Sequence, residues 1–143
     1  MSEENKALIH RFLEEIWHQG NLDAIEEFIA PNYIRHTSYT VSGGRDVHGP
    51  AGARQTIASV RTVFPDIHFT VEDMLVDGDK VIVRWTCRGT HRGVFRGVAP
   101  TGKQVTFGGM NIYRIAAGRI VERWAYEDGL GLLQQLGALP PLQ

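Results

Sequence analysis

Residues 104–126, QVTFGGMNIYRIAAGRIVERWAY, decide the fold, because they predict two antiparallel strands joined at the tight turn Ala117-Gly118. The residues on both sides of this turn are mainly β-branched and aromatic, which suits a pleated sheet. The same character recurs in four successive segments, namely Ile67–Val76, Lys80–His91, Gln104–Ile115 and Arg119–Tyr126. Four such segments in a row predict an antiparallel meander. Glycines within them, at positions 89, 108 and 109, indicate a sheet that bends strongly.

The first half of the chain has the apolar period of helices. One apolar stripe marks the first predicted helix and consists of Leu8, Ile9, Phe12, Leu13, Ile16 and Trp17. Gly20 is expected to end this helix, and Pro31 to end a second, shorter one. A third helix is expected from Pro50 to Pro65. A short strand, Tyr33–Thr37, lies between the second helix and the third.

Helices that precede a run of strands are typical of an α+β fold, in which the helices cover one face of an antiparallel sheet. A strongly curved sheet packed against three N-terminal helices forms a cone-shaped barrel, and such a cone has an inside. At 143 residues, the chain is expected to be a single domain, residues 1–143. Any pocket then lies inside this domain or between copies of it. A last short helix, Leu130–Leu136, is expected after the strands.

The composition excludes several classes of function. A formal net charge of −1 argues against a bulk attraction to nucleic acid or to an anionic membrane. The single cysteine, Cys87, excludes an internal disulfide framework and a cysteine-based zinc site. The polar N-terminus is unlike a signal peptide, and no apolar stretch is long enough for a membrane span, so a cytoplasmic protein is expected.

Motifs for nucleotide binding, zinc proteases and serine hydrolases are absent from the sequence. The six histidines have no spacing that is typical of metal ligands, and neither a metal nor an organic cofactor is expected. Arg84 belongs to a series of arginines four residues apart and has two interpretations. It lies either on a solvated sheet face, paired with Glu122 or Glu127, or in the pocket, where it would bind a carboxylate, ester or enolate oxygen.

Strand alternation after Gly118 places Glu122, Trp124, Tyr126 and Asp128 on one face of the last strand. Two large aromatic residues favour this face as the dry one, so Asp128 is expected at the rim of an apolar cavity or inside it. Burial there would raise the pKa of Asp128 and make it a usable base. Asp128 also directly precedes a short helix, and an N-cap role would instead lower its pKa. The pattern leaves both interpretations open.

The segment from Gly118 to Gly137 follows the pattern G-x-I-V-E-x-W-x-x-x-D-x-L-G-L-L-Q-Q-L-G. This segment resembles the SnoaL-like polyketide cyclase (ester cyclase) branch of the nuclear-transport-factor-2-like superfamily. Four further stretches support the resemblance, namely Pro31-Asn32-Tyr33-Ile34-x-His36, Phe64-Pro65-Asp66, Gly89-Thr90-His91 and Gly109-x-Asn111-Ile112-Tyr113-Arg114-Ile115. The resemblance covers nearly the full chain. Because this fold carries many activities, the resemblance does not fix the substrate.

The resemblance implies that Asp128 is a general acid/base. In this chemistry the aspartate takes a proton from a carbon between two carbonyls, and the enolate closes a ring by attacking a carbonyl of the same molecule. The residues expected to support Asp128 are His36, Asn111, His91 and Arg84, and Trp124 and Tyr126 are expected to line the pocket. The cavity wall or a dimer face is expected to contain Trp85, Phe107 and Tyr113.

The leading hypothesis is therefore a cofactor-independent cyclase or isomerase that acts on a small hydrophobic polycarbonyl, with Asp128 as its base. The alternatives are a non-catalytic carrier of hydrophobic ligands, a dimerisation module, or a related isomerase, dehydratase or hydrolase of the same fold. A homodimer or higher homo-oligomer that pairs through the sheet face is expected under each of them, with neither nucleic acid nor a membrane as partner.

Overall fold

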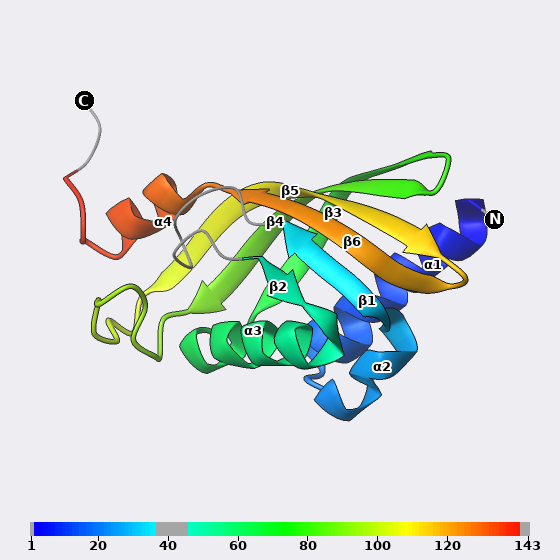
Figure 1. Ribbon diagram of the computed structural model, residues 1–143. Coiled ribbons are helices and arrows are strands. Elements are labelled where there is room, and N and C mark those ends of the chain that lie inside the picture. The colour runs from blue at the N-terminus through cyan, green and yellow to red at the C-terminus, as the bar shows by residue number, and fades with distance from the viewer. Residues whose placement is uncertain (1, 37–45, 141–143) are drawn as a thin grey trace.

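The computed structural model describes residues 2–36 and 46–140, and it shows helices packed against a curved sheet (Figure 1). The helical elements are α1 (Ser2–Arg11), η1 (Phe12–His18), η2 (Leu22–Ala24), α2 (Ile25–Phe28), α3 (Gly49–Val63) and α4 (Gly129–Gln135). The strands are β1 (Ile29–His36), β2 (Val47–His48), β3 (His68–Asp77), β4 (Lys80–Thr90), β5 (Gln104–Ala116) and β6 (Arg119–Glu127). The predicted α+β order is confirmed.

The sheet has the strand order β2-β1-β6-β5-β4-β3. Strands β3 to β6 form the predicted antiparallel meander. Strand β1 adds to this expected antiparallel sheet a pairing that the sequence did not indicate, because it pairs with β6 in parallel. Residue alternation reports which face a side chain occupies and not the direction of the neighbouring strand, so the sequence pattern could not show this pairing.

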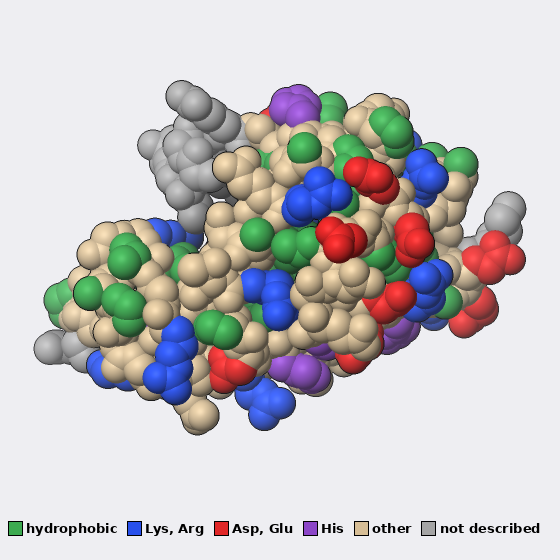
Figure 2. All heavy atoms as spheres, turned by 90° about the horizontal axis from the view of Figure 1, so that it is seen from below, with side chains coloured by type: hydrophobic (Ala, Val, Ile, Leu, Met, Phe, Trp, Pro, Cys, Tyr) green, Lys and Arg blue, Asp and Glu red, His purple; other side chains and the backbone are tan. Residues whose placement is uncertain are grey.

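Helices α1 to α3 lie against the concave side of the sheet, where the core is, and α4 lies at one end of it (Figure 1). Element η1 continues α1 with wider turns and contributes four buried side chains, Phe12, Leu13, Ile16 and Trp17. These pack with Tyr113 and other inward residues of the strands into one core cluster. The opposite side of the helices mixes acidic and basic side chains (Figure 2).

In the described part of the chain, no helix combines the length and the apolar character that a bilayer crossing requires.

A β-bulge near the start of β6 sets which of its side chains point inward. Ile115 pairs with Ile120, but the next pair is Arg114 with Glu122, so Val121 is an extra residue on β6. A shift of one residue turns every following side chain to the other face of a sheet. Beyond this bulge, Arg123 is therefore the cross-strand partner of buried Tyr113 on the inner face, and Trp124 faces outward with Ile112.

Candidate functional site

The inner face of the sheet carries a group of polar side chains within an otherwise apolar core. In the strand register, Tyr113 pairs with Arg123, and Arg123 in turn pairs with Arg35 of β1. Two residues along β5, Asn111 lies on the same inner face, opposite Val83. The set Tyr33, Arg35, Asn111, Tyr113 and Arg123 is called the inner polar group below.

Asn111 and Tyr113 are buried, with 4% and 1% of their surfaces exposed. The Asn111 amide nitrogen donates a hydrogen bond of 2.9 Å to the Tyr113 hydroxyl oxygen, and the Asn111 Oδ1 atom has no partner among the described residues. The Tyr113 hydroxyl accepts this bond, so its own proton remains available to an added oxygen atom. The pair offers one donor and one acceptor to a bound molecule.

Arg123 lies between two tyrosine side chains. Its guanidinium carbon is 5.9 Å from the centre of the Tyr113 ring. Burial raises the pKa of the Tyr33 hydroxyl, and the nearby positive charge of Arg123 opposes this rise only in part. Tyr33 is therefore a neutral donor at physiological pH. Arg123, Arg35 and Tyr33 all line one cavity of about 10 Å³, which has room for about one water-sized group.

Trp85 occupies the inner face two positions from Asn111 along the sheet, opposite Gly109. It is 5% exposed, and its indole Nε1 has no partner among the described residues. A Cβ atom on Gly109 would lie 2.4 Å from the Trp85 ring and 2.5 Å from the backbone oxygen of Tyr126. Glycine at this position therefore allows the indole to cross β5 toward β6.

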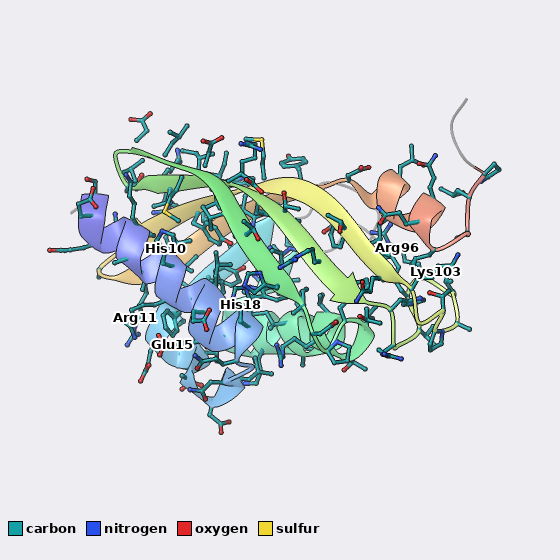
Figure 3. The ribbon with its side chains drawn as sticks, turned by 180° about the vertical axis from the view of Figure 1, so that it is seen from behind. His10, Arg11, Glu15, His18, Arg96 and Lys103 are labelled. Carbon is teal, nitrogen blue, oxygen red and sulfur yellow. The ribbon has the colours of Figure 1, made fainter. Side chains whose placement is uncertain are left out.

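Glu127 is the inner-face residue at the end of β6, where it pairs with Gly109. Its carboxylate lies 3.7 Å from Arg96, which also packs against Gly129. Figure 3 shows Arg96 beside α4, at the other end of the molecule from His10 and Arg11 of α1. Glu127 thus places an acidic side chain at the end of the inner face that is nearest to α4.

Asp128 follows Glu127 and is exposed. Its Oδ1 accepts a hydrogen bond of 2.8 Å from the Gly131 backbone N–H, so Asp128 is the N-cap of α4. The prediction that Asp128 shares a dry face with Trp124 and Tyr126 was wrong, because the bulge reverses that face. The N-cap interpretation is confirmed, and the role as a base stays a prediction.

Trp124 and Tyr126 lie on the outer face of the sheet, and Tyr126 is 58% exposed. Neither lines a described cavity, so their expected role in the pocket wall is corrected. His36 is on the same outer face, with its ring stacked on Trp124 at 5.0 Å. His36 Nε2 lies 2.7 Å from the Glu122 carboxylate, which also pairs with Arg114. His36 therefore does not face the cavity.

The remaining two supporting residues have structural partners. Arg84 is exposed on the outer face and pairs with Asp73 at 2.7 Å, so the surface interpretation holds, with a different partner from those expected. His91 is fully buried, and its Nδ1 accepts a hydrogen bond from the Thr101 backbone N–H at 3.1 Å. The ring proton is therefore on Nε2, which has no partner among the described residues. His91 fixes the loop between β4 and β5.

Other reactive groups offer no site in the described ranges. Burial raises the pKa of Cys87 to about 12, so its thiol remains protonated and unreactive. Over residues 2–36 and 46–140, three or more His, Cys, Asp or Glu side chains nowhere gather as a possible metal site.

Sequence reasoning missed Arg123, Arg35 and Tyr33 as inward polar residues. The alternation of β5 contained a signal for them, because Phe107, Tyr113 and Ile115 share one parity and mark its inner face. Extending that parity to β6 requires the position of the bulge, which the residue pattern alone does not show.

A sequence model described as SnoaL-like polyketide cyclase matches residues 7–136. The chain belongs to this family. Comparison with functionally curated proteins gives no match.

Solved structures of similar proteins confirm the fold of this SnoaL-like chain. AclR of Streptomyces galilaeus, provisionally described as a hydroxylase, is 28% identical with a TM-score of 0.84, over 99% of this chain and 89% of AclR. IdmH of Streptomyces antibioticus, provisionally described as a polyketide cyclase, is 32% identical with a TM-score of 0.79, over 93% and 98% of the two chains. A protein of Acidithiobacillus ferrooxidans, also provisionally described as a polyketide cyclase, is 30% identical with a TM-score of 0.81, over 94% of each chain.

Proposed function

We propose that the protein is a cofactor-independent cyclase or isomerase that acts on a small hydrophobic polycarbonyl compound. The observation that carries the proposal is the inner polar group, which offers unpaired donors within an apolar core to the carbonyl oxygens of a ligand. A carbon between two carbonyls is already acidic. An enzyme for such a substrate mainly needs to fold the chain, exclude water and supply a base.

In this proposal, the tyrosine hydroxyls and the guanidinium of Arg123 stabilise the enolate oxygen. Donors that are fixed before the reaction and shielded from water stabilise a developing negative charge strongly. The proton leaves the carbon for a carboxylate, and the enolate carbon then attacks a second carbonyl carbon of the same molecule. The resulting alkoxide takes up one proton, so the ring-closed product is an isomer of the substrate.

We assign the base to Asp128 on the strength of the sequence pattern. One of its oxygens holds the α4 cap, and the cap keeps the carboxylate in one orientation. Glu127 is the competing candidate, because its register position is inward and close to the inner polar group. The two carboxylates are neighbours in sequence, and separate substitutions distinguish them.

The test uses a linear phenyl-substituted β-tetraketone, with mass spectrometry to detect the isomeric ring and the product of its loss of water. The wild type is expected to form the ring faster than buffer alone. Asp128→Asn keeps an oxygen for the cap, and we expect it to lower kcat by a factor on the order of 10² to 10⁴. The matched control, Asp77→Asn, changes an exposed carboxylate at the end of β3 and is expected to leave kcat unchanged.

Two outcomes would contradict the proposal. A wild-type rate equal to the buffer rate rejects the cyclase function for this substrate class. Full activity of Asp128→Asn combined with an inactive Glu127→Gln would move the base to Glu127.

The second candidate function is a non-catalytic carrier of hydrophobic ligands. The observation that favours it is the engagement of Asp128 as an N-cap. A carrier predicts saturable binding of the tetraketone without any acceleration of ring closure, and a binding titration beside the rate measurement separates the two functions.

We also propose that two copies pair through the outer sheet face. This face carries the exposed apolar side chains Met110 and Tyr126, and such side chains gain free energy when a partner covers them. Light scattering coupled to size exclusion should give twice the chain mass of 16.0 kDa, and Tyr126→Asp should reduce it to the single-chain mass. A monomeric wild type at high concentration would reject the pairing.

A further inference from the structure

Two arginines face each other on the inner side of the sheet. Arg35 of β1 and Arg123 of β6 are direct partners in the parallel strand register. Like charges directly across a strand pair destabilise a sheet. Burial lowers the pKa of Arg35, and the nearby charge of Arg123 lowers it further. The fold thus places two positive charges together, and the charge of Arg123 makes that of Arg35 less favourable.

Neither guanidinium has a carboxylate partner within ion-pair distance among residues 2–36 and 46–140. The Nε atoms of both are buried without a hydrogen-bond acceptor. Glu127 is the acidic group whose charge reaches both arginines, and its own ion pair is with Arg96 at 3.7 Å. The Tyr33 hydroxyl stabilises the Arg123 charge by a hydrogen bond but carries no negative charge of its own. Tyr113, Tyr33 and Glu127 raise the pKa of Arg123, yet neither arginine has a carboxylate at ion-pair distance in the described ranges.

The two arginines also line the cavity of about 10 Å³. Both residues are half-buried, and the Nε atom of each is fully buried. The opposite wall consists of Phe12 together with Ala53 and Ile57 of α3. The cavity thus has two guanidinium groups on one side and an apolar wall on the other, and it has room for one oxygen atom of a ligand.

We propose that Arg35 and Arg123 bind the carboxylate of an organic acid, and that the substrate is a free polycarbonyl acid, not its neutral ester. Guanidinium groups match a carboxylate in geometry, and they are weakly hydrated enough to work in a partly buried site. The substrate class rests on the proposed cyclase function, whereas the carboxylate site does not.

The experiment compares two stable probes of almost equal shape, 4-phenylbutanoate and the neutral 4-phenylbutanamide, by isothermal titration calorimetry at pH 7.5. The wild type is expected to bind the carboxylate at least tenfold more tightly than the amide. Arg123→Met and Arg35→Met are each expected to reduce this ratio to twofold or less. Arg88→Met removes an exposed arginine on the outer side of β4 and serves as the matched control, with an unchanged ratio.

Equal affinities of the two probes for the wild type, or no detectable heat with either, would overturn the proposal. So would a tenfold preference that persists in both Arg→Met variants, or one that Arg88→Met removes equally. If Arg123→Met does not fold, Arg35→Met decides the outcome alone, because Arg35 is not part of the Arg123–Tyr113 ring contact. The probes undergo no reaction, so the binding ratio stands independently of the tetraketone assay: lost turnover with a retained ratio rejects only the cyclase function.

Discussion

Replacing Asp128 separates its two roles, since alanine removes both the cap and the carboxylate, and asparagine removes only the ionisable group. The cap serves α4, a helix of seven residues that is too short to be stable by itself. Helix α4 is held to the sheet by buried Leu132 and Leu136, and by Gln135, whose Nε2 donates to the Thr106 oxygen at 2.7 Å. Loss of the bond from Gly131 therefore loosens a docked element of the fold.

We expect Asp128→Ala to lower the free energy of unfolding by about 1 kcal/mol, the usual cost of a lost N-cap. For a chain of this length, that loss corresponds to a fall of about 4 °C in the unfolding temperature. Asp128→Asn is expected to stay within about 0.3 kcal/mol of the wild type, because asparagine caps helices as well as aspartate does. Urea unfolding followed by circular dichroism measures both values.

Two results would exclude this role of the cap. If Asp128→Ala is as stable as the wild type, the Gly131 bond does not hold α4 in solution. If Asp128→Asn matches Asp128→Ala in stability, the negative charge and not the hydrogen bond stabilises α4. The tetraketone assay then compares Asp128→Asn with the wild type, which are expected to be about equally stable, and so reports the role of Asp128 as a base.

Gly109→Ala should destabilise the fold by about 1–3 kcal/mol, because its Cβ would overlap the Trp85 ring and the Tyr126 oxygen. The control Gly108→Ala, whose nearest contact would be at 3.5 Å, should change the urea midpoint little. Equal midpoints of the two variants would contradict this packing. The hydrogen bond to His36, then that to Arg114, lowers the pKa of Glu122 from 4.5, so its contribution to stability is present above that pH and is lost as pH falls through the lower folded value. Between pH 6 and pH 3, the unfolding temperature of Glu122→Gln should therefore fall less than that of the wild type. An equal fall in both proteins would disprove this. Cys87 should react with a thiol reagent at pH 8 only after unfolding by urea, because burial raises its pKa to about 12, and rapid labelling of the folded protein would show that the core opens.

The sequence was sufficient for the elements of the fold. The apolar stripe from Leu8 to Trp17 predicted the first helix, and the β-branched and aromatic segments after Ile67 predicted the meander. Each of these is a local signal, read from the period of neighbouring residues. The parallel pairing of β1 with β6 is non-local, and no local period reports it.

The site was harder to predict for a single physical reason. The extra residue Val121 reverses the face of every residue that follows in β6. Without the bulge, Trp124 would face Asn111 on the inside, as the aromatic pattern suggested. Because of the bulge, Arg123 lies on the inner face of the sheet, and Trp124 stacks on His36 on the outer face. Asn111, expected from the resemblance as a supporting residue, lies on the inner face of β5, and its support of Asp128 stays a prediction.

Ligand binding on the inner face of the sheet can be followed at the tryptophan side chains, which lie on both faces of the sheet. The protein has three tryptophans, with the Trp85 indole Nε1 unpaired on the inner face and Trp124 on the outer face. In a ¹H–¹⁵N correlation spectrum titrated with a phenyl β-diketone, we predict that the Trp85 indole signal shifts and that of Trp124 stays in place. A shift of Trp124 with Trp85 unchanged would place the ligand on the outer face and rule out binding on the inner face.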